Sequence, residues 1–170
     1  GGDCVTTKLF PAYVFSQAQH AGTVAAHNHL SLTNPLASGK VILLGGVFIS
    51  QVAAGPIAVT DPMRGWLASS VSGGTLQSAS AIAKVRSTLS DPVGEIRIED
   101  ITATLGAAWF NSPPLLATGS ASASFVHQVP ATRSGAGAIT LYPGESTVLR
   151  TESGDTDQRW NLSIAWLEAS

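Results

Sequence analysis

The sequence predicts a single all-β domain, a jelly-roll-like sandwich of two antiparallel sheets with little helix. Short apolar and β-branched segments recur along the 170 residues and are separated by clusters of Gly, Pro, Asn and Ser, which is typical of sandwiches and jelly rolls. No window keeps a helical repeat of apolar residues over three turns, and only residues 78–85 favour a short helical turn.

The chain divides into an amino-terminal arm, residues 1–19, and a single β-sandwich domain, residues 20–170. We expect the arm to be irregular. It carries several large apolar residues, which are Leu9, Phe10, Tyr13, Val14 and Phe15. Because such residues are costly to leave in water, we expect the arm to pack on the domain or on a neighbouring subunit.

Two segments in the first two thirds of the chain have clear strand character. Residues 40–50 are apolar and β-branched and are split by Gly45-Gly46, which indicates a bulge or bend. Residues 95–105 begin with strict alternation of charged residues and isoleucine. Residues 57–60 form a further candidate strand after Gly55-Pro56, and weaker candidates are 24–26, 30–32, 85–89 and 125–129.

The carboxyl-terminal third carries the clearest pattern. Large apolar residues occupy every second position of the last segment, at Trp160, Leu162, Ile164 and Trp166. This alternation predicts a half-buried strand with both tryptophans on its core face. Upstream, candidate strands 138–142 and 146–150 flank Pro143-Gly144, which fits the two central positions of a type II turn.

Charged residues are scarce. The chain holds 9 Lys and Arg and 11 Asp and Glu, or 12% charged residues, about half the usual quarter. Ala, Ser, Gly and Thr make up nearly half of the chain. Ordering a Lys or Glu side chain costs about 1.5–2 kcal/mol, whereas Ala costs nothing. This composition predicts self-association or a permanent partner, although exported bacterial proteins and strand-rich adhesins share it.

The same numbers exclude several classes of partner and site. A net charge of −2 with scattered basic residues argues against binding nucleic acid by phosphate neutralisation. No apolar run reaches the length of about 18 residues that crosses a bilayer, so we expect no membrane partner. A single cysteine, Cys4, excludes an intrachain disulfide and a multi-cysteine zinc site.

His27 and His29 are the candidate metal ligands. On a strand, residues two apart share a face, so both imidazoles can reach one ion. Cupin-type enzymes of the jelly-roll class use such a pair, preceded by Gly and followed by Glu. Gly22 precedes the pair here, but residues 30–39 contain no Glu. The sequence therefore favours the interpretation that His27 and His29 are polar loop residues or lie at a subunit contact. We predict that the protein binds no metal and no other cofactor.

Trp66 and Trp109 are the candidate contacts for a ligand or partner, because both adjoin predicted loops. Carbohydrate-binding modules stack sugars on exposed aromatic faces. A secreted or virion-displayed carbohydrate-binding module is therefore the alternative function, followed by a cupin-like metal-dependent enzyme. No nucleophile elbow, P-loop or dinucleotide fingerprint occurs in the sequence, and we expect the protein not to be an enzyme.

Two patches of the chain resemble small β-sandwich structural proteins of tailed bacteriophage virions. In residues 34–44, an Asn-Pro-x-x-Ser-Gly turn opens a strand. In residues 139–146, a Leu-x-Pro-Gly-Glu turn precedes the final hairpin, which ends in the aromatic-rich strand 160–168. These motifs consist of residues that favour turns. The resemblance implies no catalytic residues in this chain.

The resemblance implies a head decoration, cement or fibre-type protein. Such a protein assembles in the host cytoplasm, resides in the virion, and binds the major capsid protein or other virion proteins. The resemblance also implies a homo-oligomer, in this family often a trimer, which stabilises the capsid through subunit contacts.

Overall fold

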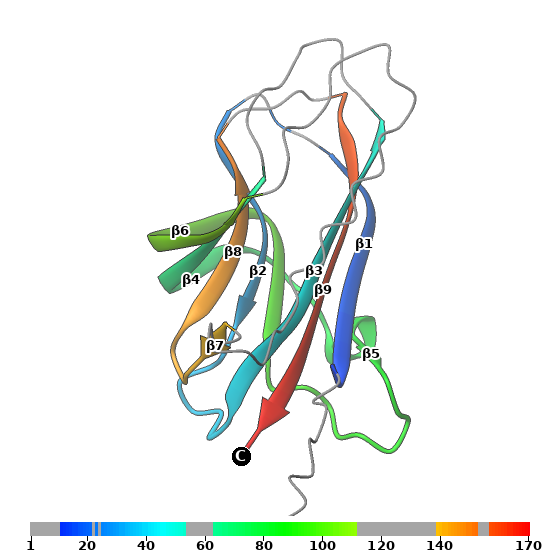
Figure 1. Cartoon of the computed structure of the whole chain (residues 1–170), viewed down its shortest axis with the longest axis vertical. Coiled ribbons are helices and arrows are strands. Elements are labelled where there is room, and N and C mark those ends of the chain that lie inside the picture. Colours follow the sequence, from blue (N-terminus) through cyan, green and yellow to red (C-terminus); the bar gives the residue numbers. More distant parts are fainter. Residues whose placement is uncertain (1–10, 22, 24, 54–62, 112–138, 153–156) are drawn as a thin grey trace, which may run out of the picture.

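The computed structural model describes residues 11–21, 23, 25–53, 63–111, 139–152 and 157–170. Two antiparallel sheets pack against each other in this part of the chain, which confirms the predicted sandwich (Figure 1). Its single helical element is the 3-10 turn η1 (Ala79–Ala81), which lies inside the segment predicted to form a helical turn. The described residues contain no helix with the length and apolar character needed to span a membrane.

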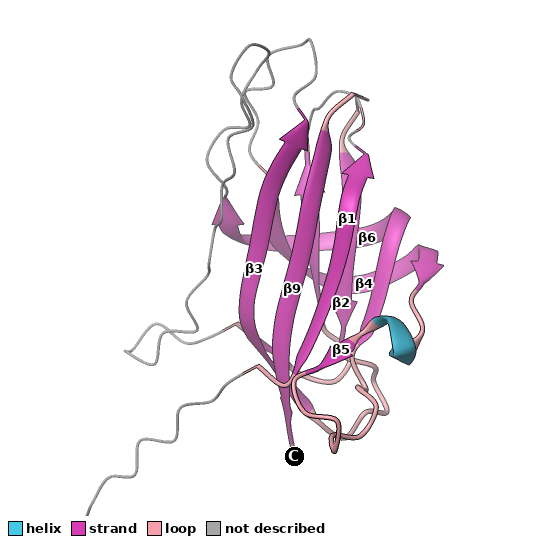
Figure 2. Ribbon diagram, turned by 90° about the vertical axis from the view of Figure 1, so that its right-hand side faces the viewer, coloured by secondary structure: helices cyan, strands magenta, loops and turns pink. Residues whose placement is uncertain are grey.

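The first sheet has five strands in the order β5-β1-β9-β3-β7. Its long members, β1, β9 and β3, lie side by side along the molecule (Figure 2). The strands are β5 (Ala83–Lys84), β1 (Tyr13–Ala21), β9 (Arg159–Ala169), β3 (Val41–Ala53) and β7 (Thr140–Leu141).

The second sheet is a ring of four strands, β2-β6-β4-β8, in which each strand pairs with two others. Its members are β2 (His27–Thr33), β6 (Glu95–Asn111), β4 (Arg64–Leu76) and β8 (Ser146–Thr151). The two long strands, β4 and β6, pair with each other along most of their length. They project sideways beyond β2 and β8 as a two-stranded extension (Figure 1).

The hydrophobic core fills the space between the sheets. The predicted alternation of β9 is confirmed, because Trp160, Leu162, Ile164 and Trp166 are all fully buried. Partners from the second sheet include Leu30, Leu32, Ile96 and Leu149. Burying each such side chain contributes about 1.5–3 kcal/mol.

The predicted bulge at Gly45-Gly46 is confirmed. The pairing of β3 with β9 shifts register between Leu44 and Gly46. Ile42 and Leu44 are buried before the shift, and Val47 and Ile49 are buried after it. The extra residue thus resets the alternation and keeps both halves of β3 facing the core.

The predicted type II turn at Pro143-Gly144 is confirmed as well. Gly144 has a φ of 91°, and the Glu145 N–H donates to the Tyr142 carbonyl oxygen at 2.9 Å. A positive φ at this position is what a type II turn requires. The turn carries the chain from β7 in the first sheet to β8 in the second.

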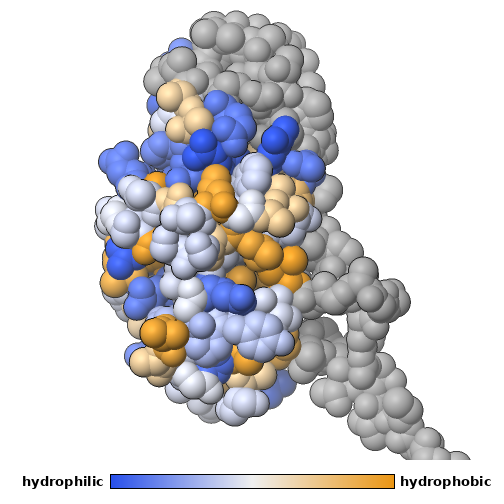
Figure 3. Space-filling model, turned by 90° about the vertical axis from the view of Figure 1, so that its left-hand side faces the viewer, coloured by the Kyte–Doolittle hydropathy of each residue, from blue (hydrophilic) through white to orange (hydrophobic). Residues whose placement is uncertain are grey.

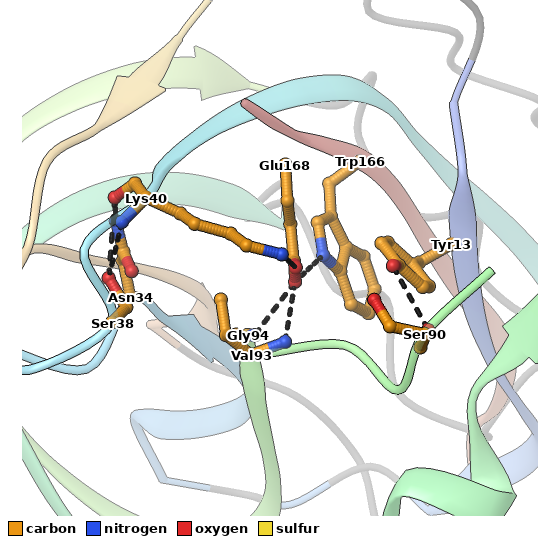
Figure 4. A network of polar contacts seen from close by, with 9 residues as sticks. All are labelled: Tyr13, Asn34, Ser38, Lys40, Ser90, Val93, Gly94, Trp166 and Glu168. Atoms are coloured by element: carbon orange, nitrogen blue, oxygen red, sulfur yellow. Dashed lines mark hydrogen bonds and ion pairs between the residues drawn. The ribbon is translucent and has the colours of Figure 1, made fainter. Parts of the chain in front are cut away.

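A buried carboxylate ties the loop before β6 to the end of β9 (Figure 4). Glu168 Oε1 accepts hydrogen bonds from the Val93 N–H and the Gly94 N–H, both at 2.9 Å, and from Trp166 Nε1–H at 3.1 Å. Glu168 Oε2 lies 3.5 Å from Lys40 Nζ. These bonds compensate the burial of a charged group at the rim of the core.

Three predictions about the elements need correction. The predicted irregular arm is wrong over residues 13–19, because they form most of β1, which lies between β5 and β9. Residues 85–89 form an exposed turn rather than a strand, and β2 begins only at His27, after the candidate strand 24–26. Residues 1–10 and the candidate strands 57–60 and 125–129 lie outside the described residues.

Candidate functional site

The two candidate metal ligands lie on strand β2, not in a loop. In the pairing of β2 with β8, Asn28 faces Arg150 and Leu30 faces Leu149, so His29 is an extra residue in a bulge. A bulge re-aims a side chain, and here the imidazole of His29 lies fully buried in the interior.

A second bulge brings another histidine to the same place. In the pairing of β1 with β9, Gln17 faces Leu162 and His20 faces Trp160, which leaves one extra residue on β1. His20 is buried, with 4% of its surface exposed. Two bulges on two different sheets therefore place His20 and His29 against each other.

These side chains form a hydrogen-bonded chain across the core. His20 Nε2 lies 2.8 Å from His29 Nδ1, and His29 Nε2 lies 2.7 Å from Thr151 Oγ1. The His29 ring makes edge contacts with the rings of His20, His27 and Trp160, with centroids 4.8–5.0 Å apart. Both nitrogens of His29 are thus engaged.

Burial determines whether the histidines in this hydrogen-bonded row carry a charge. Desolvation lowers the pKa of His29 well below its ordinary value of 6.5, and the neighbouring His20 and His27 lower it further. Desolvation also lowers the pKa of His20, against an opposing effect of Glu99 that raises it, while His27 lowers it. Both imidazoles are therefore neutral at pH 7.

This geometry does not build a metal centre from the residues that the structure describes. His27 and His29 lie together as their spacing predicts, but His29 has no nitrogen left for an ion. No group of three or more His, Cys, Asp or Glu side chains with metal-binding geometry occurs within the described ranges. His127, the remaining histidine, lies outside them.

The order Thr151, His29, His20 matches that of a nucleophile, its base and an orienting group. Thr151 and His29, however, have no exposed surface, so a substrate does not reach them. The same end of the core holds buried polar atoms that have no hydrogen-bond partner among the described residues, at His20 Nδ1, Trp160 Nε1 and the Gln158 amide. Each such atom costs about 1–3 kcal/mol of stability.

Trp66 and Trp109 are half-buried on neighbouring strands, β4 and β6. Trp109 Nε1–H donates to Thr147 Oγ1 at 2.9 Å, and its ring packs beside Phe110 with centroids 5.6 Å apart. A Cβ added at Gly65 would meet the Trp109 ring at 2.8 Å. Trp109 is therefore fixed against the sandwich over part of its surface.

The most exposed regular structure is the projecting part of β4 and β6, which we call the ribbon: residues 69–76 and 99–108. Its strands pair through Ser70 with Thr104, Val71 with Ala103 and Ser72 with Thr102. Pairing of β4 with β8 stops at residue 68, and pairing of β6 with β2 covers only residues 95–98. Within the described chain, the outer edges of the ribbon therefore have no strand partner.

Apart from Glu99 and Asp100 at its base, the ribbon consists of uncharged residues, most of them small. Residues 69–76 and 101–108 contain only Ser, Thr, Gly, Ala, Val, Leu and Ile, and most of them are exposed. Apolar and weakly polar residues predominate over the middle and lower parts of the face on which the ribbon projects, with some hydrophilic residues among them, and strongly hydrophilic residues gather higher up (Figure 3). The sequence shows that these two segments lack charged residues, but it does not show that they pair with each other and project from the sandwich.

A sharp kink joins the ribbon to the sheet. Glu99 and Asp100 have φ values of 58° and 41°, and Gly73 and Gly74 opposite them have values of 67° and 61°. A left-handed backbone at a non-glycine residue is uncommon and persists only where the surroundings fix it. The register shift between Gly73 and Thr75 marks a bulge here, which sets the direction of the ribbon.

His20, His29 and Thr151 are thus closed to solvent, whereas most residues of the ribbon are exposed. Comparisons of the chain with protein-family models, with curated protein sequences and with solved structures find no match.

Proposed function

We propose that this protein is a non-enzymatic structural protein of a bacteriophage virion, of the head decoration, cement or fibre type. It acts by docking on other protein subunits. The observation that carries the proposal is the ribbon, a projection that is uncharged beyond Glu99 and Asp100, exposed over most of its length and unpaired by any described strand along its outer edges. The turn and strand motifs of the sequence support its placement in a virion.

Physical chemistry favours a covered ribbon. An isolated two-stranded ribbon is marginally stable in water, and an unpaired strand edge offers hydrogen-bonding groups to another chain. Ser, Thr and Ala lose little side-chain entropy when they are covered. A partner surface on the ribbon therefore stabilises it at small cost.

Docking of this kind stabilises a shell by mass action. A typical stable contact buries about 800 Å² on each partner, and a protein that binds only the assembled shell must shift the equilibrium towards assembly. The mechanism needs no catalytic residue. The closed histidine chain is consistent with this, because Thr151 and His29 have no exposed surface.

The carbohydrate-binding alternative rests on the exposed parts of Trp66 and Trp109. Glycan-array binding that is lost in Trp66→Ala or Trp109→Ala would support it. Binding to no glycan would remove that alternative.

The proposal is tested by gradient sedimentation of the purified protein with isolated protein shells of the phage that encodes it. We expect the protein to move with the shells and to raise the temperature at which they come apart. A protein that stays at the top of the gradient with shells present would overturn the proposal.

A further inference from the structure

Three buried side chains at one end of the core carry polar atoms that bond to no described residue. His20 is 4% exposed, and Trp160 and Gln158 are 0% exposed. The atoms are His20 Nδ1, Trp160 Nε1 and both polar atoms of the Gln158 amide. Nearly all buried polar atoms in native proteins have a hydrogen-bond partner. Four exceptions at one end of the core indicate that another molecule completes their hydrogen bonds.

Strand register brings these side chains together. His20 on β1 lies directly opposite Trp160 on β9, so both side chains stand on the same face of the sheet. The His29 ring contacts both of them, with centroids 4.9 Å from His20 and 5.0 Å from Trp160. Gln158 stands two residues before Trp160, immediately before β9 begins, and its full burial places its amide on the core side as well.

The four atoms complement one another chemically but do not bond to one another. Trp160 Nε1–H can only donate and Gln158 Oε1 can only accept, whereas an imidazole nitrogen such as His20 Nδ1 does one or the other. None of them meets another in hydrogen-bonding geometry. A bridging water joins complementary polar groups that do not reach one another directly.

The backbone around Trp160 is irregular enough to leave room for a small molecule. Bulges occur next to His20 in β1, next to Gln51 in β3 and at His29 in β2, and each bulge interrupts regular packing. An internal water needs only about 10–15 Å³ and two to four polar partners. Because the three side chains with unpartnered atoms are 0–4% exposed, a larger ligand does not reach them in the folded protein.

We infer that a buried water binds between His20 Nδ1, Trp160 Nε1 and the Gln158 amide. The water accepts a hydrogen bond from Trp160 Nε1–H and donates one to His20 Nδ1, and the Gln158 amide supplies its third bond. The inference concerns the core and goes beyond the proposed function, which neither requires this water nor falls with it.

The water also sets the direction of the hydrogen bonds between the histidines. If Trp160 and Gln158 both donate to it, its acceptor sites are filled, and it can only donate to His20 Nδ1. If Gln158 accepts instead, the second hydrogen of the water still serves His20 Nδ1. An accepting Nδ1 makes His20 Nε2–H the donor to His29 Nδ1, and His29 Nε2–H then donates to Thr151 Oγ1. Both imidazoles therefore carry their proton on Nε2.

The direct test is NMR of the isotope-labelled full chain at neutral pH. We expect a cross peak between water and the Trp160 indole N–H with the sign of a long-lived bound water, and nitrogen shifts of the Nε2–H tautomer for His20 and His29. The Trp166 indole N–H is the matched control. It is equally buried but donates to Glu168 Oε1 at 3.1 Å, and it should show no such cross peak.

Two variants sharpen the test. Thr151→Val removes a nearby hydroxyl, and the cross peak at Trp160 should persist because it comes from water. Gln158→Leu removes one partner of the water, so it should weaken that cross peak and lower the urea midpoint of unfolding. If the amide had no partner at all, the same substitution would stabilise the protein, because it replaces an unpaired buried polar group by an apolar one.

The inference is overturned if Trp160 shows no cross peak with water, if the cross peak disappears in Thr151→Val, or if Gln158→Leu raises the stability of the protein. A proton on His20 Nδ1 would overturn the assigned direction of the hydrogen bonds. Circular dichroism confirms that each variant is folded. Sedimentation with shells is independent of all these outcomes and tests the proposed function separately.

Discussion

His20 Nε2 lies 2.8 Å from His29 Nδ1, and this contact joins β1 of one sheet to β2 of the other inside the core. One of the two nitrogens must donate a proton and the other must accept it. Protonation of both rings would remove the acceptor and place two positive charges side by side. The contact therefore holds only while at least one imidazole is neutral.

We predict that the protein loses stability in mild acid. Burial lowers the pKa of both histidines in the folded state, so the unfolded chain binds more protons below its own histidine pKa of about 6.5. Stability is full above that pH and falls below it, until the pH passes the lowered pKa of the folded state. His29 alone should account for about 1.4 kcal/mol per pH unit in this window. Urea unfolding at pH values of about 7.5, 6.0 and 5.0 measures this fall in stability.

The variant His20→Gln, His29→Gln is the matched control for the acid effect. It is expected to be less stable at pH 7.5, because it loses a buried hydrogen-bonded pair. Its stability should nevertheless change less between pH 7.5 and pH 5.0 than that of the wild type. An unchanged slope in this variant would show that other groups cause the acid sensitivity.

We predict a large loss of stability from Glu168→Ala. The substitution leaves the Val93 N–H, the Gly94 N–H and Trp166 Nε1–H without their acceptor. A loss of about 3–5 kcal/mol is expected, as for breaking one side of a buried polar network. Glu168→Gln keeps an acceptor oxygen and should lose less. Lys40→Met removes only the contact at 3.5 Å and should lose least, so an equal loss in Lys40→Met and Glu168→Ala would contradict this account.

We predict that Gly74→Ala disturbs the kink of the ribbon more than Gly39→Ala disturbs its turn. Both glycines have a φ of 61°, so both substitutions carry the left-handed backbone cost of about 1–2 kcal/mol. A Cβ at Gly74 would also meet the Glu99 carbonyl oxygen at 2.4 Å, whereas a Cβ at Gly39 meets nothing within 4 Å. Thermal unfolding of the two variants should rank them in this order, and equal melting temperatures would rule out the steric explanation.

The sequence predicts the local features whose cause is local. The alternation that ends at Trp166, the bulge at Gly45-Gly46 and the turn at Gly144 depend on residues within a few positions of each other, and all three are confirmed. The two-sheet class follows from the same short-range patterns. The prediction of an irregular arm is wrong because the apolar pattern of β1 stops after Phe15, where the strand continues with mostly polar residues.

The candidate sites were less predictable because they depend on pairing between distant segments. His20 and His29 meet only because a bulge on each of two strands re-aims a side chain, and neither bulge has a glycine to mark it. The ribbon depends on which residues of β4 and β6 remain unpaired by β8 and β2. The sequence shows that these segments lack charge, but not that they project from the same place.

The most direct test of the central claim is to place charge on the ribbon and repeat the sedimentation with shells. Ser72→Lys, Thr104→Lys changes two exposed residues and is expected to alter stability by no more than about 0.5 kcal/mol per site. Ser87→Lys, Thr88→Lys makes the same two changes on an exposed turn outside the ribbon. We predict that the first variant no longer sediments with the shells and that the second variant still does. Shell binding that is equal in both variants would contradict the claim that the ribbon is the docking surface.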